Sequence, residues 1–114
     1  MSLVNEQAAF LLDVTSLIRK ATETGWTVTG GELYRTAEQQ EIYVKTGRSK
    51  TMNSNHLKRL AIDLNFFKDG KLIYDKAQLQ AIGNYWESLN PNNSWGGNWP
   101  PRVIVDMPHF ERRV

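Results

Sequence analysis

The chain has 114 residues and a mass of 13.1 kDa, a size that favours one compact domain over residues 1–114 and leaves no room for a second folded module. With 40% hydrophobic and 23% charged residues the composition is that of a globular protein, and the net charge of only +2 gives little support for a nucleic-acid partner. The absence of cysteine excludes disulfide frameworks, thiol nucleophiles and thiolate metal sites, so any metal must be held by histidine and carboxylate side chains.

The first predicted element is an amphipathic helix that ends before Gly25. Its stripe, at alternating spacings of four and three, comprises Val4, Ala8, Leu11, Thr15 and Ile18. Leu12 widens this stripe, which we expect to serve packing. Asp13 and Arg19 interrupt the apolar stretch too soon for a cleavable signal or a membrane span, so we expect no membrane anchor.

A short strand and a second helix are expected next. Residues 26–29 are aromatic and β-branched, as is typical of a strand, and two glycines follow them. Thr36 and Gln39 form a capping box, in which each side chain can bond to the backbone of the other residue. The sequence therefore predicts a helix that begins there and runs to about Gly47.

A polar loop and a hairpin follow the second helix. Residues 47–55 show no hydrophobic periodicity, which indicates a loop. Residues 59–67 have the pattern of a strand, and Asp69-Gly70 is a turn dipeptide that favours a tight hairpin. Residues 71–74 are expected to complete that hairpin.

The last third of the chain contains a third helix and a closing strand. A second capping pattern begins at Asp75 and predicts a helix to about Leu89. We expect residues 90–94 to break the chain, residues 95–101 to form a loop stiffened by prolines, and residues 102–106 to form a short strand. This order of elements predicts an α+β fold in which helices pack on an antiparallel sheet.

The two histidines of the chain, His56 and His109, each have an aspartate nearby. A catalytic zinc site commonly uses three nitrogen or oxygen ligands, so two imidazoles and one carboxylate would suffice. His56 and Asp63 are an odd number of positions apart and would point to opposite faces of one strand. They converge only if His56 lies in the loop before the strand; the alternative is that both histidines are ordinary surface or core residues.

The strand around Asp63 has one face suited to the core and one suited to an ion. The core face is expected to comprise Ile62, Leu64 and Phe66. Asp63 then projects from the opposite face beside Ala61, whose small side chain leaves space. In the segment Asp106-Met-Pro-His109, the proline can bend the chain so that both polar side chains lie on one side, where one binds a metal and the other handles a proton, or it simply forms a turn.

Four short segments together resemble one known family. They are Tyr34-Arg35-Thr36, Ser54-Asn-His56, Ala61-Ile-Asp63 and Asp106-Met-Pro-His109. In this order they are similar to the metallopeptidases that include D-alanyl-D-alanine carboxypeptidases and L-alanyl-D-glutamate endopeptidases, which cut the stem peptides of peptidoglycan. The resemblance extends over residues 26–111, and the segments 30–36 and 95–99 look like phage endolysins of this family.

The resemblance implies a Hedgehog/D,D-peptidase-like fold and a Zn²⁺ ion held by His56, Asp63 and His109. It also implies that Asp106 is the catalytic acid and base, because a carboxylate can take the proton of the attacking water and return it to the leaving amine. Arg35 is implied to face the substrate and to stabilise the oxyanion. Without the resemblance, Arg35 would be read as part of a solvent-exposed salt bridge.

Further residues have open or minor roles. Ser54 either orients His56 or touches substrate, and Trp95 and Trp99 either fill the core or wall a groove in which a peptide lies. Glu111 is either a hydrogen-bond partner for an imidazole N–H or a solvated residue. Tyr34, Tyr43 and Trp86 are assigned to packing. Two positions depart from the family pattern, because Leu33 and Arg59 stand where glycine is common, and we expect a surface role for Arg59.

The sequence thus predicts a zinc-dependent peptidoglycan peptidase, first of all an L-alanyl-D-glutamate endopeptidase that acts as a phage or prophage endolysin. The alternatives are a D-alanyl-D-alanine carboxypeptidase and a non-catalytic, metal-stabilised binding module of the same fold, as the Hedgehog signalling domain is similar to this family.

The expected partner is the peptidoglycan stem peptide, bound by a monomer. The basic run of Arg48, Lys50, Lys58 and Arg59 is too limited to predict nucleic-acid binding, although it could attract the anionic cell wall. We expect the protein to stay in the cytoplasm until a separate membrane-permeabilising protein releases it to the wall.

Overall fold

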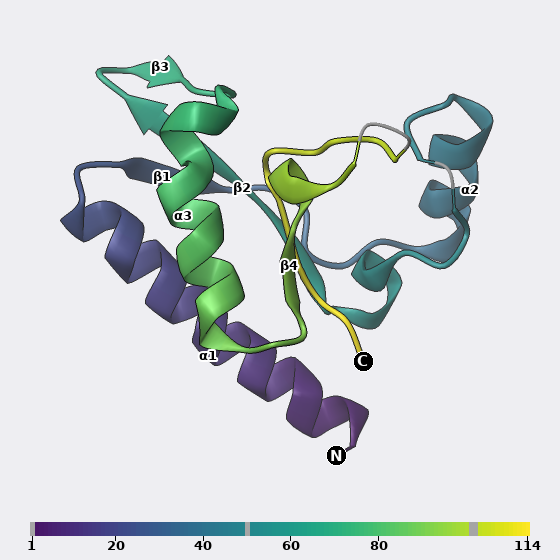
Figure 1. Cartoon of the computed structure of the whole chain (residues 1–114). Helices are drawn as coiled ribbons and strands as arrows, with labels where there is room; N and C mark the ends of the chain where they lie inside the picture. The colour runs from purple at the N-terminus through teal and green to yellow at the C-terminus, as the bar shows by residue number, and fades with distance from the viewer. Residues whose placement is uncertain (1, 50, 101–102) are drawn as a thin grey trace.

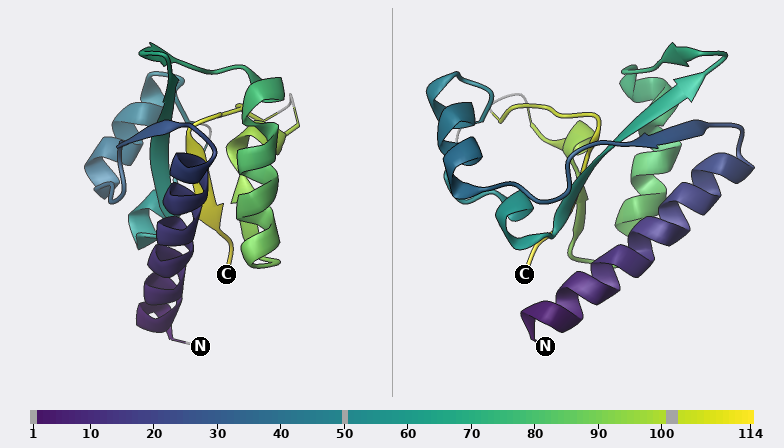
Figure 2. Two further views of the ribbon diagram at one scale, coloured as in Figure 1. Left: turned by 90° about the vertical axis from the view of Figure 1, so that its left-hand side faces the viewer. Right: turned by 180° about the vertical axis from the view of Figure 1, so that it is seen from behind.

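The computed structural model describes residues 2–49, 51–100 and 103–114, and it has an α+β fold. In chain order its elements are α1 (Leu3–Glu23), β1 (Thr27–Gly30), α2 (Ala37–Lys45), the 3₁₀ helix η1 (Asn55–Lys58), β2 (Ala61–Lys68), β3 (Lys71–Leu72), α3 (Lys76–Leu89), β4 (Asn93–Trp95), the 3₁₀ helix η2 (Gly96–Asn98) and β5 (His109–Arg112). Helices α1 and α3 lie side by side, and α2 lies on the opposite side of the sheet from α3 (Figures 1 and 2). Within the described residues, no helix is both long and apolar enough to cross a membrane.

The sheet is antiparallel and follows the order β1-β2-β5-β4, with β3 paired to the end of β2. Its two central strands, β2 and β5, are far apart in the sequence. In their register Asp63 lies directly opposite His109. Residues opposite each other in an antiparallel pair have neighbouring side chains on one face, so this register places the two side chains together.

The core lies between the sheet and the helices α1 and α3. Its largest buried side chains include Phe10, Phe66, Trp86, Trp95 and Phe110. Several of these rings meet edge to face, with centroids 5.6 Å apart for Phe10 and Trp86 and 5.9 Å apart for Trp86 and Phe110. Each such side chain contributes roughly 1.5–3 kcal/mol through its removal from water. The packing prediction for Trp86 is thereby confirmed, and of the two alternatives for Trp95 the structure supports the core.

Helix α1 has the predicted position, but the predicted packing stripe is wrong. The helix buries Phe10, Val14, Leu17 and Ala21 against the core. By contrast, Val4 is 71% exposed and Leu12 is 70% exposed, and Leu11 is also exposed. The helix carries apolar residues on two faces, and periodicity alone does not say which face meets a partner. The aromatic ring of Phe10, which reaches Trp86, decides the orientation.

Two predicted caps and the predicted hairpin are confirmed. Thr36 accepts a hydrogen bond at its side chain from the backbone N–H of Gln39, and Asp75 caps α3 by accepting from the backbone N–H of Ala77. The turn between β2 and β3 has positive φ at Asp69 and Gly70, +52° and +76°, as a type I′ turn requires. The second strand of this hairpin is shorter than predicted and ends at Leu72.

The predicted strand over residues 102–106 is wrong. Residues 103–106 have no strand structure, and Arg102 lies outside the described residues, as does Pro101 in the predicted loop. The chain pairs instead through β5, and residues 93–95, predicted as the end of a break and the start of a loop, form β4. Both strands are rich in polar residues, so the sequence alone does not indicate that they are buried.

Ion pairing explains why these polar strands are buried. The Arg112 guanidinium forms a salt bridge with Asp13 of α1 and donates from Nε to Asn93 Oδ1 at 3.1 Å. Asn93 Nδ2 in turn donates to the Trp86 carbonyl at 3.0 Å. Buried polar groups need such partners, and these partners come from elements that are distant in the sequence.

Candidate metal centre

His56 is positioned by the 3₁₀ helix that precedes β2. Ser54 begins this helix, and its Oγ accepts a hydrogen bond from the His56 backbone N–H at 3.2 Å. Arg59 ends it in the left-handed conformation, with φ of 55°, which turns the chain into β2. His56 therefore lies before the strand, as its convergence with Asp63 requires, and its side chain is only 1% exposed.

The His56 ring is oriented by a backbone carbonyl. Its Nδ1 lies 2.9 Å from the Leu33 carbonyl oxygen. A carbonyl oxygen only accepts hydrogen bonds, so Nδ1 carries the proton and a neutral ring presents the lone pair of Nε2. That lone pair is directed at Asp63.

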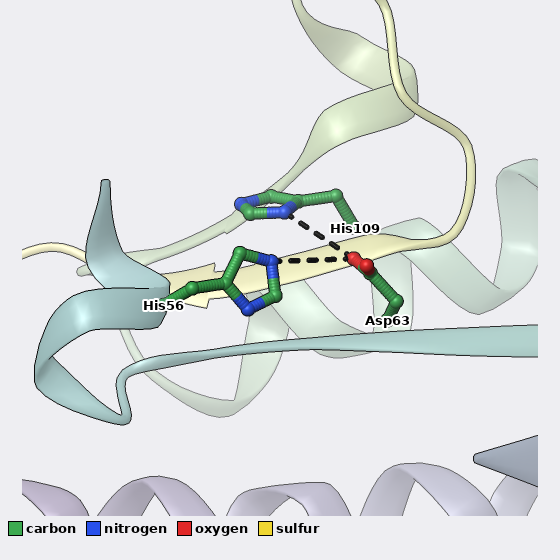
Figure 3. A group of neighbouring side chains, drawn as sticks. All are labelled: His56, Asp63 and His109. Atoms are coloured by element: carbon green, nitrogen blue, oxygen red, sulfur yellow. Dashed lines mark ion pairs between the residues drawn. The ribbon is translucent and has the colours of Figure 1, made fainter. Parts of the chain in front are cut away.

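Asp63 and His109 complete a group of three side chains that meet at one point (Figure 3). Asp63 Oδ1 lies 3.4 Å from His56 Nε2 and 3.6 Å from His109 Nδ1. One ligand atom from each of the three residues lies within 4.8 Å of the others. These residues come from η1, β2 and β5, so the sheet register is what assembles the group.

The His109 ring is oriented by Glu111. His109 Nε2 lies 2.7 Å from Glu111 Oε1, and a carboxylate accepts, so Nε2 donates and Nδ1 faces Asp63. The other oxygen of Glu111 accepts from Arg113 Nε at 2.7 Å. Of the two alternatives for Glu111, the structure therefore supports the imidazole partner, and the solvated position is excluded because the residue is buried.

The donor atoms fit a divalent metal ion. In the part of the chain that the structure describes, His56 Nε2 and Asp63 Oδ1 are buried without a hydrogen-bond partner. Two lone pairs that face each other in this way repel unless a cation lies between them. Zinc ligands at 2.0–2.2 Å in a tetrahedral arrangement are about 3.3–3.6 Å apart, which is close to the two separations from Asp63 Oδ1. A His–Asp–His set also has the nitrogen and oxygen donors that such ions accept.

The ionisable groups of the centre shift the pKa values of one another. Burial lowers the pKa of His109, but the carboxylates of Asp63 and Glu111 outweigh it and raise that pKa to about 9. Burial also raises the pKa of Asp63, yet His109 and His56 outweigh it and hold the pKa of Asp63 well below its usual range. The cluster thus favours an anionic Asp63 with positive charge beside it.

Asp106 lies at the edge of the same centre. Its backbone carbonyl accepts from the His109 N–H at 3.1 Å, and its own N–H donates to the Gly96 carbonyl at 3.2 Å. Burial raises the pKa of its carboxyl group, and the attraction of His109 offsets this only in part. A Cβ on Gly96 would lie 2.2 Å from the Asp106 carbonyl oxygen, so this close approach requires glycine.

Arg35 is held by three side chains and is not a solvent-exposed salt bridge. Its side chain is 11% exposed and forms an ion pair with Glu32. Its Nη1 donates to Gln40 Oε1 at 2.7 Å, and the guanidinium lies 4.6 Å from the centroid of the Tyr43 ring. Gln40 was not among the predicted site residues, because nothing in a single sequence marks one glutamine of a polar helix as buried.

The centre opens into a cleft of about 1140 Å³. One wall is polar and comes from the region of α2 and η1, and it includes Arg35, Tyr43, Arg48, Ser54 and Lys58. The lining also includes the apolar residues Trp99, Val103 and Ile104. Asp63, Asp106 and His109 also line the cleft, so the candidate metal centre is accessible from it.

The aromatic residues divide between core and cleft. Trp99 packs on the His109 ring with centroids 4.8 Å apart, and its Nε1 donates to Ser94 Oγ at 3.0 Å. Trp99 therefore forms part of the groove. The packing prediction is wrong for Tyr34, which is 47% exposed and lies beneath the guanidinium of Arg59. Tyr43 is half-buried, packs against the guanidinium groups of Arg35 and Arg48, and also lines the cleft.

Comparisons with known proteins find a matching family, a relative in a phage and a similar fold. The profile of a family described as D-alanyl-D-alanine carboxypeptidase matches residues 47–112, more than half of the chain. The L-alanyl-D-glutamate peptidase of Listeria phage A118 is 35% identical over 82 residues, which cover 70% of this chain and 28% of that relative. The chain thus spans little more than a quarter of that relative's length. The crystal structure of the Serratia marcescens L-Ala D-Glu endopeptidase ChiX matches with a TM-score of 0.69 and 24% identity, over 89% of this chain and 78% of that chain.

Proposed function

The chain belongs to the D-alanyl-D-alanine carboxypeptidase family of peptidases, and we propose that it hydrolyses the bond between L-alanine and D-glutamate in the stem peptide of peptidoglycan. The observation that carries this proposal is the meeting of His56, Asp63 and His109 in a cleft that Asp106 and Arg35 also line. The name of the relative in Listeria phage A118 favours this bond over the D-alanyl-D-alanine bond.

The proposed cofactor is Zn²⁺, held by His56 Nε2, Asp63 Oδ1 and His109 Nδ1. The ion, when bound, lowers the pKa of a water molecule towards neutrality and polarises a carbonyl group. Leu33 and Glu111 support this assignment, because they fix the tautomers that turn both free ring nitrogens towards Asp63.

Asp106 is the proposed acid and base. Its half-buried carboxyl group lines the cleft beside the ligand cluster, on the turn that leads into His109. From there it accepts the proton of the attacking water and returns it to the nitrogen of the leaving amine. A non-catalytic metal-stabilised module would need no such group.

Arg35 is the proposed donor to the carbonyl oxygen of the scissile bond. Its bonds to Glu32 and Gln40 hold the guanidinium in place before substrate arrives. A preorganised donor of this kind lowers the barrier because it stabilises the negative charge that develops on the oxygen, and its loss typically costs roughly 3–4 kcal/mol.

Ser54 and Trp99 are proposed to shape the substrate site. Ser54 Oγ begins the helix that carries His56 and lies 3.4 Å from Arg35 Nη1, so it connects the two groups. Trp99 covers the His109 ring and offers an apolar surface along which a peptide can lie.

The proposed biological role is that of a phage or prophage endolysin, which the phage relative supports. In that role the protein acts on the wall after a separate membrane-permeabilising protein has opened the way to it.

Digestion of purified sacculi tests the proposed bond. New amino groups on D-glutamate are expected, with no release of D-alanine. Released D-alanine without new D-glutamate amino groups would instead identify a D-alanyl-D-alanine carboxypeptidase. If the fully metal-loaded protein yields neither product, both proposed activities are contradicted.

A further inference from the structure

Arg48 lies at the mouth of the cleft and is held against an aromatic ring. Its backbone N–H donates to the Tyr43 carbonyl oxygen at 2.8 Å, just beyond the end of α2. Its guanidinium lies 4.5 Å from the centroid of the Tyr43 ring. Arg48 thus contacts Tyr43 through both its backbone and its guanidinium group, although the residue as a whole is exposed.

The same ring also carries Arg35, whose guanidinium lies 4.6 Å from the centroid. The charge of Arg35 is balanced by Glu32. Arg48 has no carboxylate within 4.0 Å among the described residues, and the residues outside the description contain no acid. Arg48 therefore has a positive charge that no acidic side chain of the described residues balances, which favours an anion beside it.

None of the acidic side chains that line the cleft forms an ion pair with Arg48, and Glu32 is already paired with Arg35. Asp63, Asp106 and Glu111 gather at the candidate metal centre. Glu87 accepts from the Trp95 backbone N–H at 3.0 Å and from Asn98 Nδ2 at 3.0 Å. The charge of Arg48 is therefore not balanced by an acidic side chain of the described cleft.

We propose that Arg48 determines substrate specificity by binding a carboxylate of the stem peptide. This inference rests on the proposed function. In an L-alanyl-D-glutamate bond, the glutamate gives its nitrogen to the scissile amide and has two carboxyl groups, of which chain continuation uses only one. The other is free unless it is amidated, and the carboxyl end of the peptide supplies a second carboxylate. A guanidinium fork binds either of them with two parallel hydrogen bonds.

Synthetic peptides distinguish the two carboxylates. The substrate is L-Ala-D-γ-Glu-L-Lys with the free α-carboxylate of glutamate, and the comparison peptides carry an amide at that carboxylate, at the carboxyl terminus, or at both. kcat and KM are measured for the wild type, Arg48→Gln and Arg48→Lys. Arg19→Gln, an exposed change on α1 outside the cleft, is the matched control.

For the wild type, we expect the KM of the peptide in which the recognised carboxylate is free to be about tenfold lower than the KM of the peptide amidated at that position. Arg48→Gln removes this preference through KM and leaves kcat within about twofold, while Arg48→Lys keeps part of the preference because it retains charge without the fork. Arg19→Gln behaves as the wild type. Whichever single amide raises the KM of the wild type identifies the carboxylate that Arg48 binds.

Other results would overturn the inference. An Arg48→Gln variant that keeps the wild-type preference excludes a contact with the carboxylate. Lys58 also lines the cleft, so equal losses in Arg48→Gln and Lys58→Gln that vanish at high salt would mean general electrostatic attraction. If the metal-loaded wild type cleaves none of the peptides, the proposed function itself is contradicted. If it cleaves all of them with the same KM, the proposed function stands and only the role of Arg48 is contradicted.

Discussion

At the scale of single residues, Glu111 shows how a side chain outside the ligand set controls it. The hydrogen bond from His109 Nε2 to Glu111 Oε1 fixes which ring nitrogen faces Asp63. We predict that Glu111→Gln lowers metal affinity by about 10- to 100-fold, because the ring loses the carboxylate that orients it and raises its basicity. Competition with a chromogenic chelator measures this affinity. An unchanged affinity would show that Glu111 does not orient the ligand, and the exposed Glu38→Gln is the control.

A variant of Asp106 tests proton transfer separately from metal binding. It is not one of the three residues whose ligand atoms converge, although it lines the same cleft. Asp106→Ala is therefore expected to keep the metal content of the parent and to lose about 10²- to 10⁴-fold in kcat. Metal content and peptide hydrolysis are measured on the same preparation. Wild-type turnover in this variant would remove Asp106 from the mechanism.

Gly96 lies where the fold leaves no space for a side chain. A Cβ at this position would lie 2.2 Å from the Asp106 carbonyl oxygen and 3.0 Å from His109 Cβ. Gly96→Ala is expected to reduce the free energy of unfolding by about 1–3 kcal/mol and to weaken metal binding, because the turn must move. Gly30→Ala is the matched control, since a Cβ there meets nothing within 4 Å. Equal denaturation midpoints for the two variants would contradict the steric account.

At the scale of elements, the ion pair between β5 and α1 ties the strand of His109 to the helical layer. Arg112 is 2% exposed and is paired with Asp13. Asp13→Ala leaves a buried guanidinium without its main partner, so we predict a loss of about 3–5 kcal/mol of unfolding free energy. The double variant Asp13→Ala with Arg112→Met should recover most of this loss. Denaturant unfolding measures both, and additive losses would argue against the pair.

Secondary structure was predictable wherever the signal is local. The caps at Thr36 and Asp75 and the Asp69-Gly70 turn depend on neighbours within a few residues, and the structure contains all three. The strands β4 and β5 were not predictable in place, because Asn93 and Arg112 are buried only through partners on other elements. The predicted packing face of α1 was wrong because the buried face is likewise determined by contacts with other elements.

At the scale of the whole molecule, the centre depends on the pairing of β2 with β5. The sequence motifs identify His56, Asp63 and His109 as candidate ligands, but only the register that sets Asp63 opposite His109 brings them together. Their role as ligands stays a prediction. Arg48 was considered only as part of a basic run, because its position over Tyr43 depends on how the loop after α2 folds back.

Metal binding should also stabilise the whole fold. The three donors come from η1, β2 and β5, so unfolding separates them and releases the ion. A ligand that binds only the folded state at a hundred times its Kd adds about 2.7 kcal/mol to the unfolding free energy. We therefore predict a higher Tm with Zn²⁺ than with a chelator. The difference should disappear in His56→Ala, and a difference that persists there would locate the ion elsewhere.

We propose above that three side chains distant in the sequence hold one metal ion on which hydrolysis depends. The most direct measurement follows metal content and stem-peptide cleavage together while a chelator removes the ion and Zn²⁺ is added back. The expected result is one ion per chain, with cleavage that falls and returns in proportion to the ion. Full cleavage by metal-free protein, or one tightly bound ion in a variant that lacks both His56 and His109, would contradict the account.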